Sequence, residues 1–185
     1  MANYTLEKLA EALQSKEPDE IAEMLLSPLK RERPWGGDRG SHDMWFQKTR
    51  NMVAVVACAL CELRDRGLLN LTPQVFRENL HLGLGMDPNL LDKNPENNRV
   101  VSAEALQALR LQTGMIALYL RALNGEMSDK TRRALLIFFD TLPAFSLDAA
   151  LAGKPQSMMT SDVAGYMTMA VTKHLGNMID ERELT

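Results

Sequence analysis

The chain has few aromatic residues, and this shortage argues against a protein built mainly from β-sheets. Aromatic residues make up 5% of the 185 residues, whereas Met occurs 12 times. Ala, Leu and Met are good helix formers, and strands are enriched in aromatic and β-branched residues. We therefore expect a core of Leu, Ala, Val and Met, with few or no strands.

The chain also lacks an excess of positive charge and a long apolar run. Its net charge is -3 and its pI is about 5.7, so no global basic field attracts nucleic acid or an anionic membrane. No apolar run approaches the roughly 18 residues that a membrane-spanning helix needs. The first residues include acidic ones and show no signal-peptide pattern. We expect a soluble, cytoplasmic chain without membrane contact.

Cysteine is scarce, and its placement does not favour a redox or metal site. Cys58 and Cys61 form a C-x-x-C inside the apolar run VVACAL, whereas a redox pair works at a helix N-terminus that lowers the thiol pKa. Zinc would need two further ligands, and His42, His81 and His174 lack the spacing of a zinc motif. We predict inert core thiols and no metal site.

Signatures of nucleotide binding and catalysis are missing as well. No G-x-x-x-x-G-K-[ST] occurs, and the glycine-rich segment from Trp35 to Ser41 lacks the lysine that reaches the terminal phosphates. No histidine has a nucleophile or a carboxylate at a recognisable spacing. His174 lies on an apolar stripe, which is typical of a core histidine. We therefore predict no catalytic residue and no cofactor.

What the sequence does contain is helical periodicity. Between Met44 and Leu63 the apolar residues recur at steps of three and four, which predicts a long helix with one buried face. Ser41 is the expected N-cap, Asp43 falls in the expected first turn, and Gly67 is expected to end the helix in a left-handed turn.

Similar signals predict the other helices and one domain. Prolines, glycines and N-cap residues mark the ends, and a polar connector is expected over residues 83–98. The predicted helices cover 5–14, 18–26 (closed by Pro28), a helix begun by Thr72 and Pro73, a long one from Ser102 to Asn124-Gly125, one from Ser128 to Phe139, and a last one capped by Ser161 or Asp162. The expected fold is all-α, a single compact helical domain of about six or seven helices spanning residues 1–185.

The segment from Ser27 to Ser41 is the predicted binding loop. Its two prolines and three glycines argue against regular structure, and it holds the densest group of cationic residues in the chain. The alternative interpretation is a solvated connector whose charges keep the chain soluble. The candidate partner-binding residues are Lys30, Arg31, Arg33, Trp35, Arg39, Lys48 and Arg50.

Four short motifs in fixed order suggest a family. They are Gly36-Gly37-Asp38 with Trp45, Glu62-Leu63-Arg64-Asp65, Leu142-Pro143-Ala144-Phe145, and Gly165-Tyr166-Met167-Thr168-Met169 with Thr172. In this order they resemble the all-alpha domain of TraG/TraD-like type IV secretion coupling ATPases, particularly the Dot/Icm and IncI-plasmid branch. That domain is inserted into a RecA-like motor between Walker A and Walker B. Glu62 replaces an expected aromatic residue, and Lys173-His174 replaces an Arg and an apolar residue.

The resemblance implies a substrate-recruitment domain, excised from a larger motor, at the cytoplasmic face of the bacterial inner membrane. Its implied partners are relaxase, accessory or effector proteins and, in conjugative systems, DNA. A hexamer is expected only of the full-length motor, and a monomer of this piece.

Three hypotheses about function follow. The first is recruitment of protein substrates through the cationic loop, which could accept an acidic peptide. The second is nucleic-acid binding, with the cations on phosphates and Trp35 stacked on a base. The third is a stand-alone helical scaffold or chaperone, with Met158, Met159, Met167 and Met169 as an adaptable groove, although a methionine stripe is more often part of a core.

Overall fold

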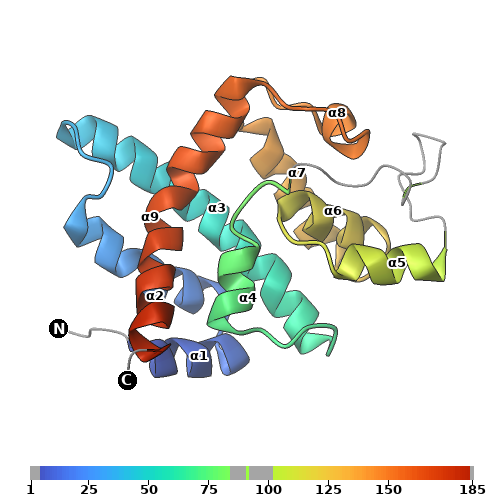
Figure 1. The fold of residues 1–185 in the computed structure, drawn as a ribbon, viewed down its shortest axis with the longest axis horizontal. Coiled ribbons are helices and arrows are strands. Elements are labelled where there is room, and N and C mark those ends of the chain that lie inside the picture. Colours follow the sequence, from blue (N-terminus) through green and yellow to red (C-terminus); the bar gives the residue numbers. More distant parts are fainter. Residues whose placement is uncertain (1–4, 84–90, 92–101, 184–185) are drawn as a thin grey trace. The chain divides into compact units, whose positions relative to one another are not determined.

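The computed structural model describes residues 5–83, 91 and 102–183, and the regular structure of this part of the chain consists of α-helices joined by short connections (Figure 1). It contains nine α-helices and no β-strand. The prediction of an all-α fold is confirmed. The number of helices exceeds the predicted six or seven because one expected helix is divided in two and a short additional helix, α8 (Leu147–Leu151), forms.

The described helices group into two compact units. Unit 1 comprises residues 1–80 and 165–185, and unit 2 comprises residues 81–164. The last helix, α9 (Met158–Glu183), begins in unit 2 and continues in unit 1. The interpretation of residues 1–185 as one domain stays a prediction.

Unit 1 is organised around the longest helix. Here α2 packs against α3, and α1 packs against α2 and α4. Its core consists of aliphatic side chains such as Leu13, Ile21, Val56 and Leu60, each at most 1% exposed. Burying one such side chain contributes about 1.5–3 kcal/mol. The other helices of unit 1 are α1 (Leu6–Ser15), α2 (Pro18–Glu32), α3 (Arg39–Asp65) and α4 (Pro73–Glu78).

The prediction that Pro28 closes the second helix is wrong. Helix α2 continues through Pro28 to Glu32. Leu25, Leu26 and Leu29 on either side of Pro28 are at most 2% exposed, so the apolar stripe stays buried beyond the proline. Burial of these leucines offsets the backbone hydrogen bond that proline removes. The predicted loop of residues 27–41 therefore shrinks to a connection of residues 33–38.

Helix α3 begins before the predicted position. Its N-cap is Asp38, whose carboxylate accepts a hydrogen bond from the Ser41 backbone N–H at 2.8 Å, so Ser41 is not the cap. At the other end Gly67 has φ 69°, which confirms the predicted left-handed turn. The predicted cap of the next helix is also confirmed, because the Thr72 hydroxyl accepts from the Val75 N–H at 3.2 Å.

Unit 2 contains four complete helices and the start of α9. The most buried is α6, in which all residues from Met115 to Ala122 are buried, including Arg121. Ser102 and Ser128 cap α5 and α7 as predicted. The helices are α5 (Ala103–Arg110), α6 (Met115–Leu123), α7 (Asp129–Asp140) and α8.

The predicted long helix after Ser102 is divided at Gly114. This residue has φ 99° and ψ 168°, a conformation that is essentially restricted to glycine. The chain there lies against residues 81–83: the Met115 N–H donates to the His81 carbonyl and the Ile116 N–H to the Leu82 carbonyl, both at 2.9 Å. These long-range backbone bonds separate α5 from α6.

Helix α9 begins earlier than predicted. It starts at Met158, and the Ser157 hydroxyl accepts a hydrogen bond from the Thr160 N–H at 3.4 Å, so neither Ser161 nor Asp162 is the cap. Most of the predicted connector over residues 83–98 lies outside the described residues. Among the described helices, none has the length and apolar character to cross a membrane.

Candidate functional site

The structure places the seven predicted binding residues on three different elements of unit 1. Lys30 and Arg31 lie in the last turn of α2, Arg33 is its C-cap, and Arg39 is the first residue of α3. All four side chains are exposed. We call these four residues the cationic end, because they flank the short connection between the two helices. Lys48 and Arg50 lie further along α3, and Trp35 lies within the connection.

Trp35 anchors the connection to α9. Its indole Nε1–H donates to the Tyr166 carbonyl at 2.9 Å, and the Tyr166 hydroxyl donates to the Trp35 carbonyl at 2.9 Å. Both residues belong to unit 1. The reciprocal pair fixes the backbone between α2 and α3, so the cationic end is held by a packed and hydrogen-bonded connection rather than by a free loop.

The burial of Trp35 does not favour the predicted stacking on a base. Its side chain is 5% exposed. The ring lies 5.6 Å from His42 and 6.4 Å from Phe46 between centroids, which are normal distances for packed aromatic groups. Its apolar surface is covered by unit 1 itself, which leaves little of the ring exposed for a partner.

Arg39 lies at a position where the dipole of its own helix disfavours a positive charge. The N-terminus of an α-helix carries partial positive charge and favours anions, yet Arg39 is the first residue of α3. It forms an ion pair with Asp43, at 3.9 Å, in which the two side chains are 90% and 67% exposed. Such an exposed pair contributes little. By contrast, Lys30 and Arg31 at the C-terminus of α2 stabilise that helix through its dipole.

Of the two remaining cations, Arg50 shares the side of α3 on which Arg39 lies, about three turns further along the helix, and Lys48 does not. Arg50 is eleven residues after Arg39 and so returns to nearly the same side of α3, whereas Lys48, nine residues after, falls on the opposite side. Lys48 follows Trp45 by three residues and therefore lies beside it on the helix.

The side chain that the sequence interpretation missed is Trp45. Its ring meets Tyr166 edge-on at 4.5 Å between centroids, and the Tyr166 side chain is 37% exposed. Met44 precedes Trp45 and is 47% exposed, and Met169 follows Tyr166 by one turn and is 45% exposed. Trp, Tyr and Met are enriched at protein interfaces. The family motifs contained both aromatic residues, but nothing in the sequence indicated that they would meet.

The four methionines of the scaffold hypothesis differ in burial. Met158, Met159 and Met169 are 81%, 59% and 45% exposed, while Met167 is 2% exposed. The interpretation of this stripe as core is therefore correct only for Met167. His174, also predicted to be buried, is partly exposed, and Leu175 is the buried residue at that level of α9.

Cys61 is a buried thiol on α3, and burial raises its pKa from 9.0 to about 11. A raised pKa means that the thiol stays protonated at pH 8, and the thiolate is the reactive form. We expect Cys61 to react with iodoacetamide at pH 8 about a hundredfold more slowly than the same residue in the unfolded chain. Mass spectrometry of the peptide containing Cys61 measures this rate. If the rates for Cys61 in the folded and the unfolded chain lie within threefold of each other, the raised pKa of this thiol is contradicted.

The described residues contain no group of three or more His, Cys, Asp or Glu side chains that could hold a metal ion. The histidine of unit 2 has a local structural role: His81 Nδ1 accepts from the Gly83 N–H at 2.9 Å, and its Nε2 lies 3.1 Å from the Thr113 hydroxyl. Comparison of this chain with protein-family models, curated proteins and solved structures gives no match.

Proposed function

We propose that this chain is a non-catalytic recruitment domain of a type IV coupling ATPase, acting at the cytoplasmic face of the membrane. It would bind relaxosome or effector proteins through the cationic end. The motif order supports the family, and the cationic end supports the binding role. The observation that carries the proposal is the set of four exposed cations at the junction of α2 and α3.

The character of the surface favours an acidic protein segment as the partner. The guanidinium groups of the cationic end can each pair with a carboxylate. Arg39 has no stabilising role at the start of α3, which favours a role toward a partner. The exposed Tyr166 edge and Met169 on the neighbouring α9 offer apolar contact area of the kind that anchors a peptide.

DNA is the weaker alternative as a partner. The predicted stacking residue, Trp35, is buried, and base stacking supplies much of the affinity for single strands. The remaining cations would provide only salt-dependent phosphate contacts, and the net charge of -3 opposes them. A protein partner is therefore the proposal, and DNA binding is an outcome that the experiment distinguishes.

Reversing the charge of Arg31, Arg33 and Arg39 to Glu is expected to weaken binding of a Glu- and Leu-rich peptide at least about tenfold, because three favourable charge pairs become repulsive. Fluorescence anisotropy with a fluorescein-labelled peptide measures the affinity. Far-UV circular dichroism should remain unchanged, since the three side chains are exposed.

The matched control reverses Lys130, Lys154 and Lys173, three exposed lysines outside the cationic end. An equal loss in this control would show that net charge alone drives binding and would refute the proposed surface. Tighter binding of a labelled single-stranded oligonucleotide than of the peptide would make DNA the partner. Walker A upstream and Walker B downstream in the same reading frame would test the family.

The scaffold or chaperone alternative is favoured by one observation, the exposure of Met158 and Met159 at the start of α9. Methionine side chains adapt to irregular apolar partners. This alternative expects peptide binding that survives the triple charge reversal and changes little with salt, which is the opposite of the result expected for recruitment through the cationic end.

A further inference from the structure

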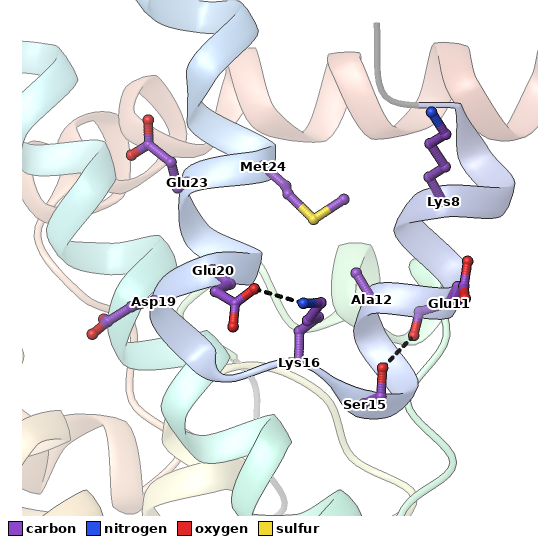
Figure 2. A pocket seen from close by; sticks show the side chains of 9 residues that line it. All are labelled: Lys8, Glu11, Ala12, Ser15, Lys16, Asp19, Glu20, Glu23 and Met24. Carbon is purple, nitrogen blue, oxygen red and sulfur yellow. Dashed lines mark hydrogen bonds and ion pairs between the residues drawn. The ribbon is translucent and has the colours of Figure 1, made fainter. Parts of the chain in front are cut away.

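A cleft lined mainly by acidic side chains lies between α1 and α2 of unit 1 (Figure 2), and its charge is opposite in sign to that of the cationic end. Its volume is about 650 Å³. Figure 2 shows the Met24 side chain pointing between the two helices, with Glu20 and Lys16 paired between them and Lys8 and Glu11 on α1. The Asp19 and Glu23 carboxylates lie on the side of α2 that faces away from α1. Nothing in the recruitment proposal uses this cleft.

The cleft remains between the helices because their leucines and isoleucine are buried elsewhere. Leu9 and Leu13 of α1 and Ile21 and Leu25 of α2 are at most 2% exposed, and α2 packs chiefly on α3. The residues that α1 and α2 turn toward the cleft are smaller or more flexible. Ala12 and Met24 form its apolar floor.

The charges around the cleft are predominantly negative. Four carboxylates and two lysines line it, which leaves a surplus of two negative charges. Lys16 Nζ lies 3.0 Å from Glu20 Oε2, and this hydrogen bond raises the pKa of Lys16. The pair thus neutralises Lys16 and Glu20, and the surplus of two arises because Glu11, Asp19 and Glu23 outnumber the one remaining lysine, Lys8.

The arrangement of these carboxylates is unfavourable for the chain on its own. Asp19 and Glu23 are four residues apart on α2, and Glu20 and Glu23 are three apart. Like charges at these spacings destabilise a helix by about 0.2–0.5 kcal/mol per pair. The helix dipole favours Asp19 and Glu20 in the first turn of α2, but Glu23 lies beyond that turn. A cationic partner would remove the repulsion.

We propose that this cleft binds a cationic amphipathic helix of a partner protein. Apolar side chains of the partner would lie over Met24 and Ala12, and its long Lys or Arg side chains would reach over α2 to pair with Asp19 and Glu23. Charge complementarity selects the partner, and methionine adapts to different apolar shapes. The cationic end would take an acidic segment, so the two surfaces bind partners of opposite sign and either proposal can fail without the other.

The experiment uses the whole chain and a fluorescein-labelled amphipathic peptide of Leu and Lys, about 14 residues or four helical turns long. The same peptide with Gln in place of Lys is the probe for charge, because it carries no carboxylate that the cationic end could bind. We expect micromolar affinity for the Lys peptide and at least about tenfold weaker binding of the Gln peptide.

Two variants locate the binding site. Asp19→Asn with Glu23→Gln should weaken binding of the Lys peptide about tenfold while leaving the Lys16–Glu20 pair intact. Met24→Gln should weaken it to a similar degree, because it makes the apolar floor polar at nearly constant volume. Far-UV circular dichroism checks that both variants keep the helical content of the parent chain.

The control variant is Asp140→Asn with Asp162→Asn, which removes the same charge from two exposed residues outside the cleft. The proposal is overturned if this control weakens binding as much as the cleft variant does, since net charge would then be the cause. It is also overturned if Met24→Gln leaves the affinity unchanged, or if the Lys peptide does not bind at micromolar protein. Weaker binding of the Lys peptide by both cleft variants, with unchanged binding by the control variant, supports the proposal.

Discussion

Replacing Glu126 with Gln should lower the free energy of unfolding by about 3–5 kcal/mol, because it leaves buried arginine charge without a counter-ion. Glu126 Oε2 accepts a hydrogen bond from Arg121 Nε at 2.5 Å, and Oε1 pairs with Arg110 Nε. The Arg121 and Glu126 side chains are 5% and 6% exposed. Within the described residues, Arg121 Nη2 has no hydrogen-bond partner. Glu126 is therefore the main group that compensates the buried charge of Arg121.

Urea unfolding followed by circular dichroism measures this effect. A double variant, Arg121→Met with Glu126→Leu, is the informative control: removing both buried charges together should restore much of the lost stability, because desolvation of the pair is costly. Asp129→Asn, which removes an exposed partner of Arg132, should have a much smaller effect. A loss below about 1 kcal/mol for Glu126→Gln would show that water compensates Arg121 and that the ion pair is dispensable.

The second large effect is expected at Gly114, where alanine should cost about 3 kcal/mol or more. Two costs combine there. The backbone has φ 99° and ψ 168°, which only glycine adopts readily. An added Cβ would also lie 2.7 Å from the Gly83 Cα and 2.7 Å from His81 Cε1. The first of these neighbours is backbone and cannot move without disturbing the bonds from α6 to residues 81 and 82.

Gly125→Ala separates the two costs. Gly125 also has positive φ, 86°, but an added Cβ meets nothing within 4 Å. Its substitution should cost only about 1–2 kcal/mol, the conformational part. Thermal or urea unfolding of the two variants side by side gives the comparison. Equal losses would mean that the close approach of Gly114 to Gly83 does not contribute.

Local signals in the sequence predicted most of the helix ends. Thr72, Ser102 and Ser128 cap their helices as expected, and Gly67 ends α3. These residues act on backbone groups no more than a few positions away, so their effect is visible in the sequence. The errors at Pro28 and Gly114 have a different origin: burial of α2 keeps the helix intact through a proline, and contact with residues 81–83 interrupts an otherwise continuous helical pattern.

The candidate site was predicted in part. Lys30, Arg31, Arg33 and Arg39 are exposed near one junction, as their proximity in the sequence indicated. The burial of Trp35 was not predicted, because its hydrogen-bond partner, Tyr166, is 131 residues away. The acidic cleft was missed because Glu11 and Glu23 have the sequence pattern of ordinary solvated charges. Only the packing of α1 beside α2 brings them to one cleft.

The sequence by itself determined that the chain is helical, where most helices begin and end, and where its cations are concentrated, because these properties depend on periodicity and on neighbours within a few residues. Tertiary structure alone decided that Trp35 is buried, that Trp45 meets Tyr166, and that a cleft opens between α1 and α2. Burial and contact depend on which distant segments pack together, and local preferences do not contain that information.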